Sequence, residues 1–156
     1  MFKIKIFEEI LEPFYVKAIQ DWEDNKSWEE NAGFDLFIPE DHLIEPFEIC
    51  HRIPLGISLA AYSEEGTSEN FDMRPRSSLT KLPLIMGNSP ATIDIGYRGI
   101  LEARFHNISG KEVKISAGQR LVQVVRGNLG PIKEITLVEE LTETKRADGG
   151  FGSTGT

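Results

Sequence analysis

The chain has 156 residues, of which 40% are hydrophobic and 27% are charged. This length is enough for one domain with its own core and too short for two ordinary domains. The mean hydropathy is -0.25, and no apolar stretch approaches the roughly 20 residues that a membrane-spanning helix needs. No apolar segment with a small-residue cleavage site follows the first residues, so we expect a cytoplasmic protein with no membrane partner.

The formal net charge of -8 argues against an extended polyanion as a partner, so we expect no nucleic-acid binding. The charge is unevenly distributed along the chain. Residues 1–73 carry 17 acidic and 5 basic side chains, whereas residues 74–156 carry 8 and 12, so the two halves carry -12 and +4. The basic half therefore remains a candidate for binding a small anion.

The chain offers no recognisable metal-ligand spacing. It has one cysteine, Cys50, and three scattered histidines. A single cysteine forms neither an internal disulfide nor a Cys-x-x-Cys pair, and the histidines have no neighbours at the intervals typical of zinc sites. We therefore predict no zinc site.

Several short segments alternate apolar and polar side chains, the period-2 pattern of half-buried strands. They are residues 2–6, 57–61, 101–106 and 113–115. Turn-forming pairs such as Gly87-Asn88 and Gly130-Pro131 separate such segments. The pattern predicts an all-β fold, either a barrel or a sandwich.

Two segments depart from the strand pattern. Residues 13–30 are acidic, contain Trp22 and Trp28, and begin with Pro13, which suits the first turn of a helix. A short helix and a long surface loop are both compatible with this segment. Residues 62–72 are rich in Ser and Glu and predict an exposed loop.

The first polar cluster, residues 74–78, reads Arg-Pro-Arg-Ser-Ser. A guanidinium beside two hydroxyls and several backbone N–H groups suits the oxygens of a phosphate. The same residues also fit the start of a helix with a serine as its cap.

The second cluster spans residues 87–99, where the Gly-Asn and Ser-Pro steps favour a turn between two strands. We expect a β-hairpin whose exposed backbone can read the edge of a base. Asp94 follows it and is ionised at neutral pH, so it can serve as a general base. It is equally compatible with an ion pair to Arg98 or a turn cap.

Two further clusters lie closer to the C-terminus. Residues 120–125 place Arg120 and Gln123 in an apolar strand, where their polar ends need partners for packing or for function. Residues 146–156 contain four glycines and no aliphatic side chain that could anchor a strand, so the tail cannot repay its own ordering entropy. It is either a frayed terminus or a flexible arm that orders over a ligand or a neighbouring subunit.

These clusters, taken in order, resemble the five motifs of the all-β, trimer-forming dUTPase family (deoxyuridine 5'-triphosphate nucleotidohydrolases). The matching segments are AGFDL at 32–36, PRSS at 75–78, IDIGYRG at 93–99, RLVQVV at 120–125 and RADGGFGSTG at 146–155. The resemblance implies a distorted jelly-roll-like β-barrel over residues 1–145, with insertions near 13–30 and 62–72. It implies that residues 146–156 form a Gly-rich arm that closes over the active site.

The resemblance also implies an activity, namely hydrolysis of dUTP to dUMP and pyrophosphate by attack of water on the α-phosphate. This reaction keeps uracil out of DNA and supplies dUMP for thymidylate synthesis. Asp94 resembles the base that activates the water. The residues that resemble substrate-binding positions are Arg76, Ser77, Ser78, Asn88, Thr92, Ile93, Tyr97, Gln123, Arg146, Phe151, Ser153 and Thr154.

The roles implied for these residues differ by cluster. Arg76, Ser77, Ser78 and Gln123 resemble the phosphate-binding positions. The resemblance assigns uracil recognition to Asn88 and to the backbone of Thr92 and Ile93, and it packs Tyr97 against the deoxyribose. On the arm, Arg146, Ser153 and Thr154 would close on the γ-phosphate while Phe151 covers the uracil.

By the same resemblance the cofactor is Mg²⁺, held by the triphosphate and by water, which suits its reluctance to dehydrate. No direct protein ligand is implied, and Asp35 is a candidate for a contact through water. The family's assembly implies a homotrimer whose active sites are shared between chains. The chain departs from the usual family residues at three positions, Leu55, Ser78 and Ala91.

Two alternative functions belong to other classes. One is a deaminase similar to dCTP deaminase, which needs a glutamate where we align Arg104, with Glu102 two residues away. The other is a nucleotide-sensing or protein-binding module on the same fold, with the acidic insertions as its contact surface.

Overall fold

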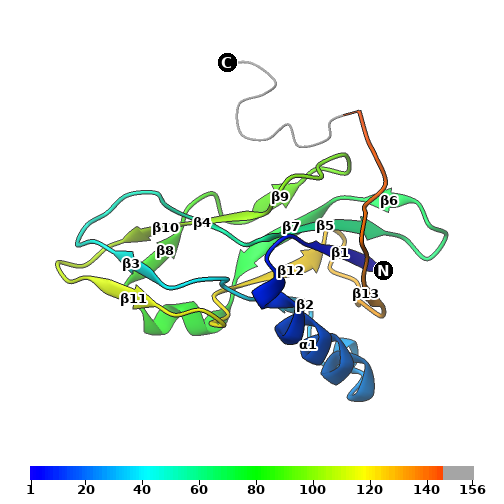
Figure 1. Cartoon of the computed structure of the whole chain (residues 1–156), viewed down its shortest axis with the longest axis horizontal. Helices are drawn as coiled ribbons and strands as arrows, with labels where there is room; N and C mark the ends of the chain where they lie inside the picture. The colour runs from blue at the N-terminus through cyan, green and yellow to red at the C-terminus, as the bar shows by residue number, and fades with distance from the viewer. Residues whose placement is uncertain (146–156) are drawn as a thin grey trace.

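The structure, a computed structural model, describes residues 1–145 of the chain. This part is mostly β, as predicted, with one α-helix (Figure 1). The helical segments are η1 (Glu9–Leu11), α1 (Glu12–Asp24), η2 (Ser27–Glu29) and η3 (Ser77–Lys81), where η denotes a short 3₁₀ helix. The strands are β1 (Phe2–Ile6), β2 (Gly33–Leu36), β3 (His42–Ile44), β4 (His51–Pro54), β5 (Ile57–Tyr62), β6 (Ser68–Glu69), β7 (Phe71–Pro75), β8 (Leu84–Met86), β9 (Ala91–Ile93), β10 (Glu102–Asn107), β11 (Val113–Ile115), β12 (Val122–Arg126) and β13 (Ile135–Leu137).

The strands pair into four small sheets over residues 1–145, with the orders β13-β1-β5-β6, β4-β10-β8, β11-β3 and β2-β12-β7-β9. All pairings are antiparallel except that of β1 with β13. Most of the predicted site residues in the described part of the chain lie on or beside the strands of sheet β2-β12-β7-β9. Strands β2 and β9 form its two edges, and β12 and β7 lie between them. Figure 1 shows α1 beside β2, on the side away from β9.

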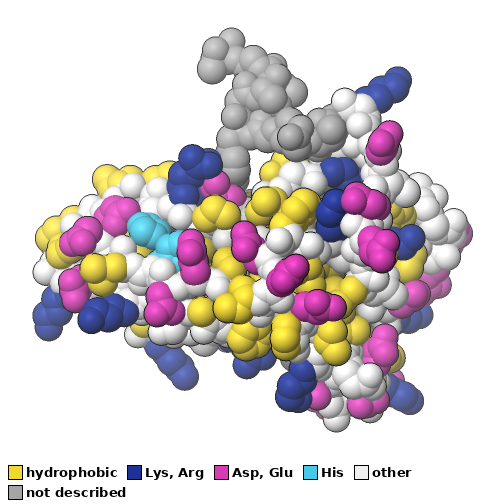
Figure 2. Space-filling model, in the orientation of Figure 1, with side chains coloured by type: hydrophobic (Ala, Val, Ile, Leu, Met, Phe, Trp, Pro, Cys, Tyr) yellow, Lys and Arg dark blue, Asp and Glu magenta, His cyan; other side chains and the backbone are white. Residues whose placement is uncertain are grey.

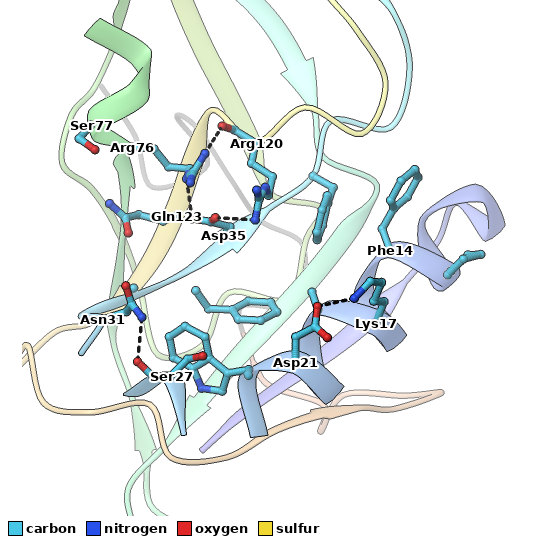
Figure 3. Close-up of a pocket in the computed structure, with 16 residues that line it drawn as sticks. Phe14, Lys17, Asp21, Ser27, Asn31, Asp35, Arg76, Ser77, Arg120 and Gln123 are labelled. Atoms are coloured by element: carbon cyan, nitrogen blue, oxygen red, sulfur yellow. Dashed lines mark hydrogen bonds and ion pairs between the residues drawn. The ribbon is translucent and has the colours of Figure 1, made fainter. Parts of the chain in front are cut away.

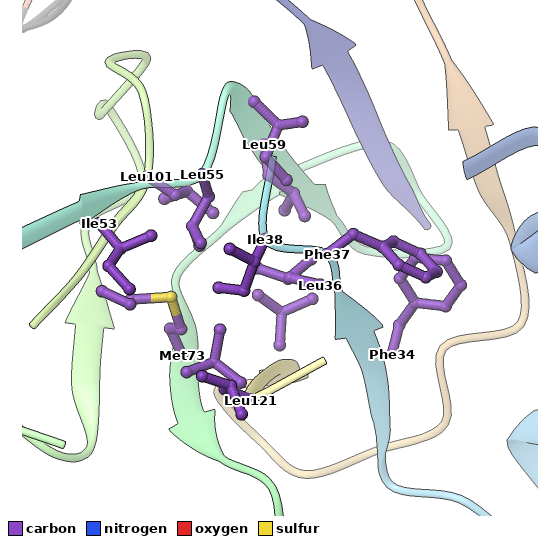
Figure 4. Close-up of a cluster of buried hydrophobic side chains, with 14 of the residues drawn as sticks. Phe34, Leu36, Phe37, Ile38, Ile53, Leu55, Leu59, Met73, Leu101 and Leu121 are labelled. Atoms are coloured by element: carbon purple, nitrogen blue, oxygen red, sulfur yellow. The ribbon is translucent and has the colours of Figure 1, made fainter. Parts of the chain in front are cut away.

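The core follows from the apolar positions of the alternating segments. In β10, Ala103 and Phe105 are fully buried while the residues between them are half-buried, as the period-2 pattern predicts. Side chains from β2, β4, β5 and β7 meet in the centre of the molecule (Figure 4). Leu55, one of the departures from the family pattern, is fully buried there. Burial of this cluster supplies the main driving force for folding.

Residues 13–30, which the sequence leaves open between helix and loop, form α1 and η2. Pro13 occupies the first turn of α1, where its missing N–H costs nothing. Tyr15 and Trp22, two turns apart, are buried on one face, which explains why the segment is helical despite its acidic composition. Among residues 1–145, no helix is both long enough and apolar enough to cross a membrane.

The prediction of an exposed loop over residues 62–72 is wrong at both ends of the segment. Tyr62 ends β5, and β6 and the start of β7 occupy residues from Ser68 onward. Phe71 and Asp72 are buried. The Ser- and Glu-rich composition marks only the tight connection at 63–67, because cross-strand pairing and burial outweigh local composition in the rest.

The predicted hairpin within residues 87–99 is also wrong. The strands on either side of the turn join different sheets: β8 pairs with β10, whereas β9 pairs with β7. Asn88 adopts a positive φ of 53°, so the turn that the Gly-Asn step predicts is present. Local turn chemistry does not specify which strand becomes the partner, and here both partners come from elsewhere in the chain.

Candidate functional site

The centre of the candidate site is one carboxylate shared by two guanidinium groups. Asp35 lies on β2, and its Oδ1 is 2.7 Å from Arg76 Nε while its Oδ2 is 3.2 Å from Arg120 Nη1 (Figure 3). The side chains of Asp35, Arg76 and Arg120 are 22%, 28% and 49% exposed. Ion pairs that remain this accessible to water contribute little to stability. An incoming anion can therefore replace the carboxylate as the partner of the arginines at low cost.

Arg76 is positioned by its backbone as well as by its side chain. Its N–H donates to the carbonyl of Leu121 at 2.9 Å, immediately after β7 ends. Its Nη1 donates to the carbonyl of Arg120 at 3.0 Å and to Oγ of Ser78 at 3.2 Å. The guanidinium is thus aimed before any ligand binds, which lowers the entropy cost of binding.

Ser77 and Ser78 lie at the start of η3, so the sequence expectation of a helix start was correct in part. No side chain caps this 3₁₀ helix, and the predicted serine cap is therefore wrong. Ser77 is exposed, and its hydroxyl accompanies the guanidinium of Arg76 at the pocket edge (Figure 3). Ser78, which stands where the family usually has glycine, is not among the described residues with positive φ, so a side chain fits there without strain.

Gln123 lies on β12 directly opposite Asp35 on β2. Its Nε2 donates to the carbonyl of Pro75 at 3.3 Å, so the polar end of this side chain has a partner within the sheet. Gly33, on the same strand as Asp35, leaves the space that the carboxamide occupies, because a Cβ at Gly33 would collide with Gln123 Oε1. Arg120 precedes β12 and is exposed, so the expectation that it lies within an apolar strand is wrong.

These residues line one side of a pocket of about 690 Å³, and helix α1 lines the other. Figure 3 shows Asp35, Arg76, Arg120 and Gln123 together on the sheet side, across from the helix. The wall contributed by α1 contains Pro13, Phe14, Lys17, Ala18, Asp21 and Trp22. Sequence reasoning assigned no function to these helix residues. The acidic, tryptophan-containing composition of residues 13–30 was their only signal.

The remaining described site residues form a second group on and around β9. Thr92 and Ile93 lie on the strand, Asn88 precedes it, and Asp94 and Tyr97 follow it. The backbone N–H of Tyr97 donates to the carbonyl of Asp94 at 3.0 Å, and the Tyr97 hydroxyl donates to the carbonyl of Ile100 at 2.9 Å. Asp94 is exposed, so its carboxylate is accessible to water.

Arg98, which the sequence offered as an ion-pair partner for Asp94, has other contacts. Its Nη1 donates to the carbonyls of Ile95 and Tyr97, and its Nε donates to the carbonyl of Thr142 at 3.0 Å. The guanidinium therefore ties the turn after Asp94 to the chain near residue 142. It acts on the backbone in this turn rather than on a carboxylate.

The two groups do not meet within the part of the chain that the structure describes. Asp35 lies on edge strand β2, whereas Thr92 lies on the opposite edge strand β9. The pocket is lined by Asp35, Arg76, Ser77 and Gln123 but by none of the residues of the second group. The predicted arm residues Arg146, Phe151, Ser153 and Thr154 lie outside the described residues.

The donor set bears on how a divalent cation would fit. Within residues 1–145, no cluster of three or more His, Cys, Asp or Glu side chains could hold a metal. Asp35 is the carboxylate beside the proposed phosphate-binding residues, and its two oxygens contact Arg76 and Arg120. One carboxylate beside a phosphate site is compatible with Mg²⁺, which commonly binds through substrate phosphates, water and one or two carboxylates.

A family model described as dUTPase matches residues 23–155. The chain is 41% identical over 128 residues to the deoxyuridine 5'-triphosphate nucleotidohydrolase of Hydrogenobaculum sp. (strain Y04AAS1), covering 80% of this chain and 83% of that protein. It is 36% identical over 156 residues to the enzyme of the same name from Clostridium kluyveri, covering 97% and 95%.

A solved structure extends the similarity to the fold. A mutant dUTPase from phage phi11 of S. aureus, solved to show the coordination of a structural Mg(II) ion, superposes with a TM-score of 0.52. Its sequence is 21% identical, and the match covers 74% of this chain and 84% of that one. At this identity the likeness concerns the fold alone, and it confirms the expected β architecture.

Proposed function

We propose that this chain, which belongs to the dUTPase family, hydrolyses dUTP to dUMP and pyrophosphate. The reaction would keep uracil out of DNA and supply dUMP for thymidylate synthesis. The observation that carries the proposal is the pair of preoriented guanidiniums at Asp35, at the edge of a pocket of nucleotide size. Such a pair suits the oxygens of a phosphate chain.

The phosphate chain would bind the residues on the sheet side of the pocket. Arg76 presents N–H donors in a planar fork, and Ser77 and Ser78 add hydroxyls. Gln123 would donate from its carboxamide to the α-phosphate. Asp35 already holds the two guanidiniums in place. Phosphate oxygens would therefore replace its carboxylate on arginines that are already ordered, which lowers the entropy cost of binding.

The uracil would be read by the residues around β9. Asn88 and the backbone of Thr92 and Ile93 would pair with the uracil edge, which excludes cytosine because its exocyclic amine is a donor where uracil has an acceptor. Tyr97 would pack against the deoxyribose and leave no room for a 2'-hydroxyl. Its hydroxyl, bonded to the Ile100 carbonyl, holds the ring in one orientation.

Asp94 would act as the general base. An ionised carboxylate can accept a proton from the water that attacks the α-phosphorus, and pyrophosphate then leaves from the opposite side. Mg²⁺ bound to the phosphates would neutralise the charge that develops there. Asp35, released from Arg76 and Arg120 by the phosphates, would contact that ion through water.

We further propose that the active site is completed between chains of a homotrimer. The proposal is supported by the separation of the two groups of site residues at opposite edges of sheet β2-β12-β7-β9. A neighbouring copy could bring its β9 group to the Asp35 pocket. The arm residues Arg146, Phe151, Ser153 and Thr154 would then close over the nucleotide, excluding water during the reaction.

One assay tests the activity and separates it from the alternatives. The purified protein is incubated with Mg²⁺ and dUTP, dCTP, dTTP or UTP, and the release of pyrophosphate and ammonia is followed. We expect pyrophosphate from dUTP alone. Ammonia from dCTP would indicate a deaminase, although Arg104, paired with Glu102 at 2.7 Å, stands where that enzyme needs a glutamate. If neither pyrophosphate nor ammonia is released, the protein is a binding module.

A further inference from the structure

One face of sheet β2-β12-β7-β9 connects the two groups of site residues. Register places Gln123 opposite both Asp35 and Arg74, and places Asp72 opposite Thr92. Directly opposite residues of antiparallel strands share a face, as do residues two apart on one strand. The side chains of these five residues therefore lie on one face, which runs from the phosphate-binding edge to the strand that precedes Asp94.

Asp72, at the centre of this face, is bonded on both carboxylate oxygens. Thr92 Oγ1 donates to Asp72 Oδ1 at 2.8 Å, and Arg74 Nη2 donates to Asp72 Oδ2 at 2.9 Å. Asp72 is only 8% exposed. The bond from Arg74, and secondarily that from Thr92, hold the pKa of the carboxyl below its usual range. The side chain is therefore an ionised acceptor at neutral pH, and each of its oxygens accepts from one of these two donors.

The element that Asp72 contacts is a short edge strand, whose Ala91 and Ile93 also pack against the core. Strand β9 has three residues and lies at the sheet edge, where its partner in the described part of the chain is β7. So short a ladder is weak by itself. Thr92 is its middle residue, and Asp94 follows two positions later. A side-chain bond at Thr92 thus restrains the backbone shortly before the proposed base.

We propose that Asp72 is a positioning residue for the proposed reaction. By accepting from the Thr92 hydroxyl, it fixes the end of β9, and with it the uracil-reading backbone of Ile93 and the carboxylate of Asp94. Arg74 keeps the Asp72 carboxylate charged and oriented toward Thr92. The inference rests on the proposed function and adds a residue that acts through Thr92. Displacement of a reacting group by about 1 Å can lower a rate roughly 100-fold.

A double-mutant cycle tests the coupling between Asp72 and Thr92. Asp72→Ala, Thr92→Val and the double variant are compared for kcat and KM with dUTP and Mg²⁺. We expect each single variant to lower kcat about tenfold or more, and the double variant to lose no more than the worse single one, because both remove the same bond. Thr92→Ser keeps the hydroxyl that donates to Asp72, so it should lose clearly less of kcat than Thr92→Val.

Further variants separate positioning from general loss of structure. Asp72→Asn keeps the shape of the side chain and can bond Thr92 by accepting from its hydroxyl or by donating to it. It should therefore lose less of kcat than Asp72→Ala, and it serves also if Asp72→Ala does not fold. Thr136→Val, a matched control on β13, should change kcat less than about twofold. The folded fraction of each variant is measured by circular dichroism, and kcat is expressed per folded chain.

Three results would overturn the inference. They are losses that multiply in the double variant, a Thr92→Ser variant as impaired as Thr92→Val, and an Asp72→Asn variant as impaired as Asp72→Ala. If the unchanged protein releases no pyrophosphate from dUTP, the proposed function and this inference are both rejected. Normal activity of the unchanged protein together with unimpaired variants would reject the role of Asp72 alone.

Discussion

At the scale of single residues, Asp35 explains how a cluster of positive charge is kept ready without a ligand. Two arginines close to each other repel, and the carboxylate between them offsets that repulsion. The three side chains are accessible enough to water that the pairs are easily exchanged. We infer that substrate phosphates take over Arg76 and Arg120 and release Asp35 for its contact with metal-bound water.

The role of Asp94 predicts a separation of catalysis from binding. Asp94→Asn keeps the shape of the side chain but removes the base, so kcat should fall by about 100-fold or more. The dissociation constant for dUTP, measured by calorimetry with Mg²⁺, should stay within about tenfold. A near-normal kcat in this variant would show that another group is the base.

The close contact between Gly33 and Gln123 predicts an effect on substrate affinity. In Gly33→Ala the new Cβ displaces the Gln123 carboxamide and its bond to Pro75, so KM for dUTP should rise several-fold. The free energy of unfolding should fall by about 1–3 kcal/mol. Gly110→Ala, where a Cβ meets only ordinary contacts with Phe47 at 3.5 Å, is the matched control. An unchanged KM would mean that Gln123 does not bind substrate.

At the scale of elements, α1 is attached to the sheet by its buried face. Trp22 packs edge-on against Phe34 with ring centroids 5.5 Å apart, and its Nε1 donates to the carbonyl of Ile132 at 2.8 Å. Phe14 stacks on Phe37 at 5.4 Å near the pocket. The aromatic contacts hold the helix firmly enough to form a fixed wall opposite the phosphate-binding residues.

The Trp22 bond predicts a measurable loss of stability. Trp22→Phe keeps an aromatic ring but leaves the buried carbonyl of Ile132 without this donor, which should cost about 1–3 kcal/mol. The midpoint of urea unfolding should fall while the slope stays constant. Trp28→Phe removes the other tryptophan, which is only partly buried, and should change the midpoint much less. Equal effects of the two substitutions would contradict this account of how α1 is anchored.

At the scale of the whole molecule, the surface has features that a single chain leaves unused. Hydrophobic side chains lie at the surface in several places in Figure 2. Phe47, Ile49 and Ile108 are 66%, 77% and 58% exposed, and Phe47 is linked to Ser109 by a backbone hydrogen bond. Exposed apolar side chains that lie together commonly mark contacts between chains. This observation supports the proposed homotrimer.

Shared active sites predict complementation between two inactive variants. Arg76→Ala lacks a phosphate-binding residue and Asp94→Asn lacks the base, so each alone should have little activity. If the two groups come from different chains, trimers refolded from an equal mixture should recover about a quarter of the unchanged activity, because random assembly leaves that share of sites intact. Activity no higher than the average of the two separate variants would show that each site is built within one chain.

The sequence by itself determined several of the strands and the family. Period-2 alternation marked β1, β10 and β11 because side chains on opposite faces of these strands meet different environments. It also marked β5, which is buried along its whole length. The five motifs assigned candidate site residues because phosphate binding and base reading need particular polar groups in order along the chain. The roles of Asp94, Arg76 and Gln123 in the reaction stay predictions of this kind.

Only the tertiary structure decided what depends on contacts between distant segments. It showed residues 13–30 to be a helix that lines the pocket, and it separated β8 from β9 by pairing each with a remote strand. It also brought Asp72 to Thr92, 20 positions apart. Strand partners and helix docking are set by long-range burial, which short-range pattern does not encode. For that reason the placement of Asp35 between two arginines, and of Asp72 behind Thr92, could be seen only in the folded chain.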